Sequence, residues 1–282
     1  MSQEDNSASL TRDGMNLKNS AKRIKGILTA LMYVAIYYAV SAVIESVYIM
    51  HHSFDYGLSV SEIERSVLDG AYALSVISAV ISLWIYLIIG KINKKPIEKE
   101  VHNKKVVPMI NIMAVCMAIG ARMSVNSYYY FSQSIHLLKK SIDDAAAISP
   151  ELSTVGQMLT AVFAIAIIAP FFEEVLFRGL VYGKLRTVMR PWAAIFLQAV
   201  FFGVAHAVLF QSIFAVIMGI LLGIIYYKIG SIVTSAICHS AFNLSVVFFY
   251  EDMTALSAVL MLVFGSLLVI SSMIYIIKSE RM

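Results

Sequence analysis

Long apolar stretches fill almost the whole of this chain after its first 26 residues. A helix needs about 20 mostly apolar residues to cross the roughly 30 Å hydrocarbon core of a bilayer. A chain that is 59% hydrophobic and only 14% charged has the composition of a membrane protein. The sequence therefore predicts an all-α fold, a polytopic transmembrane bundle of about eight helices. The eight stretches that reach or approach the required length are 27–49, 68–90, 107–131, 155–180, 192–209, 212–228, 231–250 and 254–277.

The first apolar stretch is not the core of a signal peptide. Residues 27–49 are too long for such a core, and no small-x-small cleavage pattern follows them. We therefore expect residues 1–26 to form a polar N-terminal tail and residues 27–277 to form a single transmembrane domain.

Lysine and arginine are distributed unevenly between the polar segments. The segments on one side of the predicted bundle hold Lys18, Lys22, Arg23, Lys25, Lys91, Lys94, Lys95, Lys99, Lys104, Lys105, Lys184, Arg186, Arg190, Lys278 and Arg281. The segments on the other side hold fewer cations or balance them with acidic residues. Because loops rich in Lys and Arg stay in the cytoplasm, both termini are predicted to be cytoplasmic. This bias also accounts for the net charge of +4, so the expected partner is the lipid bilayer and not nucleic acid.

A small set of ionisable side chains lies inside the predicted spans. Such groups are costly in lipid and generally face a protein interior or a water-filled cavity. Most of them belong to the second half of the chain, which is therefore expected to hold a functional site. Glu45 and Arg122 could reach that site or pair elsewhere in the bundle. The full set is Glu45, Arg122, Glu173, Glu174, Arg178, His206 and His239.

The segment FFEEVLFRGL at 171–180 contains two adjacent glutamates that helical geometry separates. Glu174 and Arg178 are four residues apart, hence on one face, with the acid on the N-terminal side, the favourable order. Glu173 points about 100° away and has no such partner in its own helix. We therefore predict that Glu174 and Arg178 form a structural ion pair and that Glu173 serves as a general base.

Two later spans contribute further polar side chains. In FFGVAHAVLF, the ring of Phe202 can pack beneath the imidazole of His206, four residues on. In CHSAFN, His239 and Asn243 share a helix face and can offer two N–H donors to one oxygen. A carboxylate, two imidazoles and a carboxamide on neighbouring helices together predict hydrolysis by an activated water molecule.

The three motifs resemble those of a known family. Glu-Glu-x-x-x-Arg, Phe-x-x-x-His and His-x-x-x-Asn, in this order and spacing, are similar to the motifs of the CAAX-protease and bacteriocin-processing (CPBP) family. That family includes the type II CAAX prenyl endopeptidases and the abortive-infection-like (Abi) bacterial membrane proteases. The resemblance covers about residues 155–250, and the remaining spans match only as generic hydrophobic helices.

The resemblance implies an intramembrane endopeptidase with a catalytic core at about 155–250. It implies that Glu173 and His206 activate the attacking water and that His239 and Asn243 stabilise the oxyanion. The substrates would be membrane-associated peptides or proteins, of lipidated or leader type. Support of the site would come from Glu174, Arg178 and Phe202.

Several alternatives stay open. Zinc bound by Glu173, His206 and His239 could activate the water, as in a metalloprotease; we favour a site without a cofactor because no His-Glu-x-x-His helix is present. The chain could also be a non-catalytic membrane regulator or immunity-type protein that binds a partner membrane protein. A proton-coupled transporter is less favoured, since no inverted repeats are evident. The chain is expected to be a multi-pass protein located in a bacterial plasma membrane.

Overall fold

Every regular element in the described part of the chain is a helix. The computed structural model describes residues 3–55, 58–92, 106–147, 152, 154–245 and 253–279, with side chains of the first helix from residue 19 onward. The α-helices are α1 (Gln3–Asp55), α2 (Val60–Ile92), α4 (Pro108–Ser132), α5 (His136–Ala147), α6 (Val155–Phe163), α7 (Ala169–Glu174), α8 (Gly183–Leu185), α9 (Pro191–Ala205), α10 (Leu209–Ile229), α11 (Ile232–Leu244) and α12 (Ala255–Ser279). Two π-helical segments, η1 (Ala164–Ile168) and η2 (Val175–Tyr182), lie on either side of α7.

The helices confirm a polytopic membrane bundle. Among the described residues, six helical segments are long and apolar enough to cross a bilayer, namely Asn19–Phe54, Val60–Ile92, Pro108–Ser132, Val155–Leu185, Leu209–Ile229 and Ala255–Ser279. The helices α9 and α11 are also apolar but have only 15 and 13 residues, or roughly 20 Å of axial length each. Together, these eight segments correspond to the eight predicted apolar stretches.

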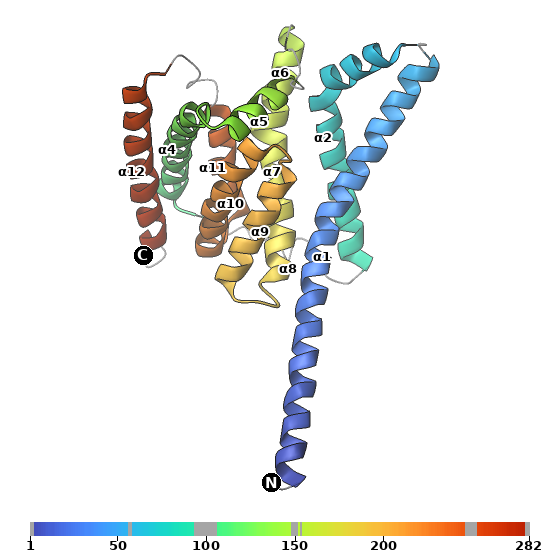
Figure 1. Cartoon of the computed structure of the whole chain (residues 1–282), viewed down its shortest axis with the longest axis vertical. Coiled ribbons are helices and arrows are strands. Elements are labelled where there is room, and N and C mark those ends of the chain that lie inside the picture. The colour runs from blue at the N-terminus through green and yellow to red at the C-terminus, as the bar shows by residue number, and fades with distance from the viewer. Residues whose placement is uncertain are drawn as a thin grey trace.

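The bundle has three groups of helices, as Figure 1 shows. The long helices α1 and α2 form an antiparallel pair on one side, and α4 packs against α12 on the opposite side. Between these pairs lie α9, α10 and α11, together with the continuous segment from α6 to α8. The start of α1 and the end of α12 point toward the same end of the bundle, as eight crossings require.

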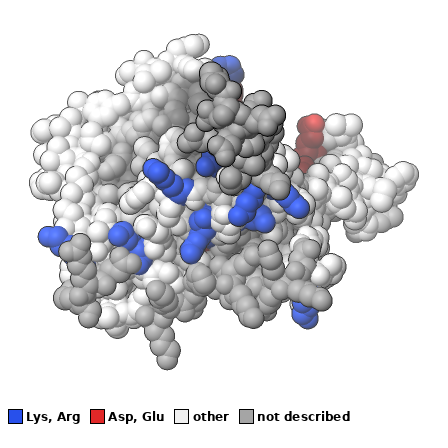
Figure 2. Space-filling view, turned by 90° about the horizontal axis from the view of Figure 1, so that it is seen from below, with Lys and Arg blue, Asp and Glu red and all other residues white. Residues whose placement is uncertain are grey.

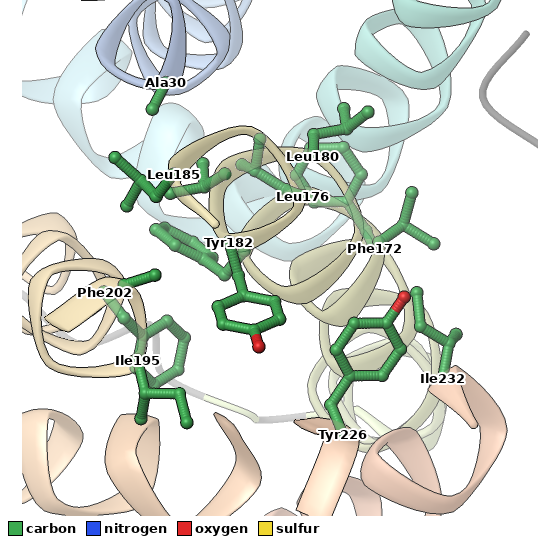
Figure 3. Close-up of a cluster of buried hydrophobic side chains, with 14 of the residues drawn as sticks. Ala30, Phe172, Leu176, Leu180, Tyr182, Leu185, Ile195, Phe202, Tyr226 and Ile232 are labelled. Carbon is green, nitrogen blue, oxygen red and sulfur yellow. The ribbon is translucent and has the colours of Figure 1, made fainter. Parts of the chain in front are cut away.

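The segment from α7 to α8 forms the centre of the main hydrophobic core. All eight residues of η2 are buried, which is the pattern of a helix enclosed on every side. Figure 3 shows Leu176 and Tyr182 of this segment among side chains from α1, α9, α10 and α11. The two adjacent glutamates of α7 directly precede this enclosed segment.

Several predicted boundaries differ from the structure, and one helix was not predicted. The fifth stretch was expected to extend to residue 209, but α9 ends at Ala205, and Ala207 adopts a left-handed backbone conformation with φ 58°. Hydropathy could not locate this turn because the residues on both sides of it are apolar. The helix α5 lies in the segment between the third and fourth stretches, where no helix was predicted. The predicted seventh stretch and catalytic core end at 250, but α11 ends at Leu244 and residues 246–250 lie outside the described residues.

Gly203 allows the tight hairpin between α9 and α10. A Cβ atom at this position would lie 2.9 Å from the carbonyl oxygen of Ser212, closer than real Cβ atoms approach backbone oxygen. The two helices can therefore pack closely one turn before His206, which follows the last residue of α9. This contact fixes the position of the imidazole relative to α10.

Candidate active site

The fourth membrane span contains a break in its backbone hydrogen bonding. At the end of η1, the N–H of Ala169 donates to the carbonyl of Ala164, in the π-helical pattern. The carbonyl of Ile165 would normally accept a hydrogen bond from the N–H of Ala169 or of residue 170. The first of these is already bonded to Ala164, and Pro170 has no N–H, so the backbone of this helix leaves the Ile165 carbonyl without a donor. The side-chain nitrogen of Asn243, on α11, donates to this carbonyl at 2.9 Å. The π-helical break thus ties α11 to the fourth span next to the two glutamates.

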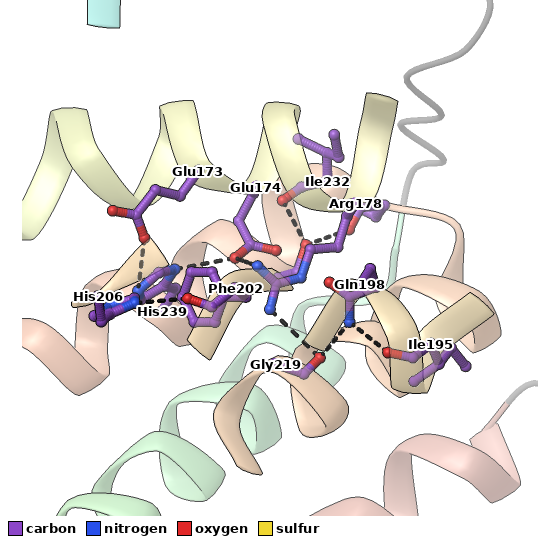
Figure 4. Close-up of polar contacts among 12 residues, drawn as sticks. Glu173, Glu174, Arg178, Ile195, Gln198, Phe202, His206, Gly219, Ile232 and His239 are labelled. Carbon is purple, nitrogen blue, oxygen red and sulfur yellow. Dashed lines mark hydrogen bonds and ion pairs between the residues drawn. The ribbon is translucent and has the colours of Figure 1, made fainter. Parts of the chain in front are cut away.

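The predicted ion pair between Glu174 and Arg178 is confirmed. Glu174 Oε1 lies 2.8 Å from Arg178 Nη1, and neither side chain is exposed. The guanidinium also stacks over the ring of Phe202, with its carbon 4.8 Å from the ring centroid. Gln198 donates to the carbonyl of Gly219 at 2.8 Å and closes the polar cluster beneath the arginine (Figure 4). Because each charge has its counter-charge beside it, the desolvation cost of burying both is partly offset.

Glu174 has a second partner that the sequence did not reveal. His239 Nδ1 lies 3.0 Å from the same Glu174 oxygen that pairs with Arg178. An imidazole held this way donates its Nδ1–H to the carboxylate, which fixes the orientation of the ring. The other ring nitrogen, Nε2, lies 3.7 Å from Glu173 Oε2. His239 therefore stands between the two adjacent carboxylates, as Figure 4 shows.

His206 is oriented by the last turn of α9. Its Nδ1 lies 2.8 Å from the carbonyl oxygen of Phe202, and its ring packs edge-on against the Phe202 ring with centroids 4.7 Å apart. The predicted packing of these two residues is confirmed. Since a carbonyl can only accept, Nδ1 carries the hydrogen, and Nε2 of the neutral ring keeps a lone pair. His206 is thus able to accept a proton through Nε2.

The candidate site lines a cavity of about 800 Å³, here called the main cavity. The four residues predicted to act on substrate, Glu173, His206, His239 and Asn243, all contribute to its lining. The side chain of Glu173 is 27% exposed, whereas that of the adjacent Glu174 is fully buried. The two glutamates therefore occupy different environments, one open to the cavity and one enclosed with its cation.

A smaller cavity of about 190 Å³ lies behind the site and shares Glu173, Phe202 and His206 with the main cavity. Tyr37 and Tyr38 of α1 line it, and the Tyr38 hydroxyl donates to the carbonyl of Ala205 at the end of α9. Sequence reasoning missed these tyrosines, although the run YYAV in an apolar helix contains the two hydroxyl groups.

The two ionisable residues whose role was open have different positions. Arg122 lines the main cavity, and its Nη2 donates to the carbonyl of Phe242 at 3.0 Å. Glu45 lies on the exposed surface of α1 and is not part of the cavity lining. Only Arg122 therefore belongs to the candidate site.

The alternative zinc site would need a cluster of ligating side chains. Within the described part of the chain, no group of three or more His, Cys, Asp or Glu side chains is arranged to hold a metal ion. We therefore derive no chemical step through a metal.

Comparison with known proteins finds a similarity for the part of the chain that holds this site. Residues 155–245 match the family model described as type II CAAX prenyl endopeptidase Rce1-like. No curated protein and no solved structure matches the chain. The matched segment runs from α6 to the residue after α11 and contains all three motifs around the main cavity. This segment, about a third of the chain, is therefore similar to the type II CAAX prenyl endopeptidases that the family model describes.

Proposed function

We propose that this protein is an intramembrane endopeptidase that hydrolyses membrane-associated peptides with a water molecule activated by Glu173 and His206. The observation that carries the proposal is the contrast between two adjacent glutamates. Glu174 is enclosed with Arg178 and His239, whereas Glu173 lines the main cavity, with its Oε2 3.7 Å from His239 Nε2. A cavity-facing carboxylate beside two oriented imidazoles is suited to general-base chemistry.

The attacking water would lie between Glu173 and the lone pair of His206 Nε2. As the water oxygen bonds to the carbonyl carbon of the peptide, one of its protons passes to the Glu173 carboxylate. The carbon–nitrogen bond then breaks, and the same proton passes to the leaving amine nitrogen. The products are a carboxylic acid and an amine, and the site returns to its starting protonation state.

The oxyanion would be stabilised from α11. His239 presents Nε2 toward the cavity, and it can donate there when both ring nitrogens carry hydrogen, since Nδ1–H is already given to Glu174. Asn243 uses one amide hydrogen for the Ile165 carbonyl and has a second one available for the substrate. One such donor typically contributes 10²–10³ in rate.

The two roles of Asn243 can be separated by a double substitution. Asn243→Ala is expected to lower turnover about 10²-fold and also to destabilise the fourth span, because the Ile165 carbonyl loses its donor. Pro170→Ala restores a backbone N–H that can reach that carbonyl. Turnover and thermal stability of both single variants and of the double variant would be measured in nanodiscs. The double variant should recover stability but not turnover; recovery of both would show that Asn243 serves only the backbone.

The proposed activity is tested with purified protein in lipid nanodiscs and a panel of quenched fluorescent peptides, lipidated and unlipidated. Leader-type sequences and palmitoylated or prenylated peptides are the substrates to examine first. Each assay is run with and without a chelator. Turnover that is insensitive to chelation supports water activation by the glutamate, and loss on chelation with recovery on added zinc supports the metal alternative. Absence of turnover across the panel, together with a cellular phenotype that survives loss of Glu173, would instead support a non-catalytic regulator.

A further inference from the structure

Outside the interior of the bundle, most charged side chains of the described residues lie at one or the other of its two ends. One end, here called the basic end, comprises the start of the apolar part of α1, the end of α2, the turn between α8 and α9, and the ends of α10 and α12. Its cations are Lys22, Arg23, Lys25, Lys91, Lys184, Arg186, Arg190, Lys228 and Lys278. Figure 2 shows Lys and Arg gathered over this face, with acidic side chains visible only at its margin.

The opposite end, here called the acidic end, is formed by the start of α2, by α5 and by the turns that α5 adjoins. Its acidic residues are Glu62, Glu64, Asp69, Asp143 and Asp144, and its cations are Arg65, Lys139 and Lys140. None of the Asp and Glu side chains that the structure describes belongs to the basic end. Because cations are retained on the cytoplasmic side of a membrane, the basic end faces the cytoplasm.

The main cavity extends from the candidate site toward the acidic end. Its outer lining comes from the last turns of α4, from α5, from the first turns of α10 and from the residue range just before α12. Each of these segments lies at the helix end opposite to the basic end. The residues concerned are Tyr129, Tyr130, Gln133, Ile142, Phe210 and Met253. No residue of the basic end contributes to the lining.

We propose that the cavity opens to the extracytoplasmic side of the membrane and that the substrate is a peptide segment exposed there. The identification of the ligand as a substrate rests on the proposed function, but the direction of the opening rests only on charge and cavity position. A peptide presented from the cytoplasm would meet the basic end, which the cavity does not reach. The substrate class is therefore an exported or membrane-anchored peptide whose scissile bond lies toward the outer leaflet.

The direction of the opening is tested by labelling in intact bacterial cells that express the full chain. Gln133→Cys places a thiol at the cavity mouth, and Thr187→Cys places one on the exposed turn of the basic end. The matched control is the unsubstituted protein, which has Cys116 and the fully buried Cys238. A membrane-impermeant maleimide should label the variant at 133 in intact cells and the variant at 187 only after permeabilisation.

The opposite labelling pattern, or equal labelling of both variants in intact cells, would overturn the proposal. A functional readout follows in proteoliposomes sorted for one orientation. Blocking the thiol at 133 from the outside should reduce peptide turnover at least tenfold, and blocking the thiol at 187 should leave it unchanged. Since labelling does not depend on hydrolysis, a protein without peptidase activity would still report the direction of its cavity.

A different observation concerns charge inside the main cavity. Apart from histidines, its lining contains one guanidinium, Arg122, and one carboxylate, Glu173. Arg122 is held by the carbonyl of Phe242 and by the ring of the same residue, whose centroid lies 4.2 Å from the guanidinium carbon. Its Nε has no hydrogen-bond partner, and among the described acidic side chains none forms an ion pair with it. The cavity therefore contains a fixed cation whose hydrogen-bonding capacity is only partly used.

We infer that Arg122 binds a carboxylate of the substrate, either an acidic side chain or the C-terminus. A guanidinium can pair with a carboxylate through two parallel N–H···O hydrogen bonds. Such a pair is stronger in a partly enclosed cavity than in bulk water. The carboxylate of Glu173, on α7, would repel the substrate carboxylate that Arg122, on α4, attracts. The two charges thus set the direction in which a peptide lies across the site.

This subsite is tested by binding, which needs no turnover. The probes are an N-palmitoylated octapeptide with a free C-terminal carboxylate and the same peptide with a C-terminal amide, titrated into the Glu173→Gln protein in nanodiscs. The free acid should bind at least tenfold more tightly than the amide. Arg122→Gln should abolish that difference, Arg122→Lys should keep part of it, and Arg186→Gln at the basic end should keep all of it. Equal binding of the two probes, or a preference that survives Arg122→Gln, would overturn the assignment.

Discussion

Glu173→Gln is expected to lower peptide turnover about 10³-fold, within the range for loss of a general base. The amide is nearly isosteric with the carboxylate but cannot accept a proton from water. The fold should be retained, because Glu173 is partly exposed and its nearest ionisable partner, His239, lies 3.7 Å away. Turnover would be measured with the fluorescent peptide that the wild type cleaves best, at saturating concentration and in nanodiscs.

Glu45→Gln is the matched control for this substitution. It makes the same chemical change on an exposed face of α1, outside the main cavity, and should leave turnover unchanged. Wild-type turnover in the Glu173→Gln protein would exclude this carboxylate as the base. An equal loss in both variants would point to a general effect of charge on the protein in its membrane.

Glu174→Gln is expected to destabilise the protein by about 3–5 kcal/mol, as for removal of one member of a buried ion pair. The substitution leaves the guanidinium of Arg178 fully enclosed without a counter-charge, and Arg178 Nε already lacks a hydrogen-bond partner. The double variant Glu174→Gln, Arg178→Met should be more stable than the single variant, because the uncompensated charge is removed. Thermal unfolding in nanodiscs would measure both differences.

The exposed pair Lys140–Asp144 provides an internal comparison for the same chemistry. Its atoms lie 2.6 Å apart, also with an i, i+4 spacing, but the side chains are 63% and 64% exposed. Asp144→Asn should therefore cost less than about 1 kcal/mol. A loss at Glu174 as small as that at Asp144 would mean that water reaches the buried pair.

Sequence reasoning succeeded where a single helix determines the contact. The ion pair Glu174–Arg178 and the ring packing of Phe202 on His206 both follow from i, i+4 spacing, and both are present. The eight apolar segments were located by hydropathy alone, because bilayer thickness sets the length of a spanning helix. These features depend on helix geometry and on the thickness of the bilayer, so the spacing and polarity of residues along the sequence are enough to predict them.

Contacts between helices were not predictable in the same way. The bond from His239 to Glu174 joins residues 65 positions apart, and nothing in the spacing of either motif specifies it. The bond from Asn243 to the Ile165 carbonyl depends on a π-helical turn that no side-chain pattern marks. Pro170 was the one available signal, since a proline within an apolar span leaves a carbonyl that must find another donor.

The short lengths of α9 and α11 have a consequence for how the protein enters the membrane. At 15 and 13 residues, neither reaches the roughly 20 residues that hold a lone helix across the bilayer. The helix between them, α10, is long enough by itself and joins α9 and α11 through two tight turns. During synthesis the three helices must therefore partition into lipid as one unit anchored by α10. A polar substitution on the lipid-facing side of α10, such as Ile217→Asp, would then prevent insertion of the segments that carry His206 and His239, far from either histidine in sequence.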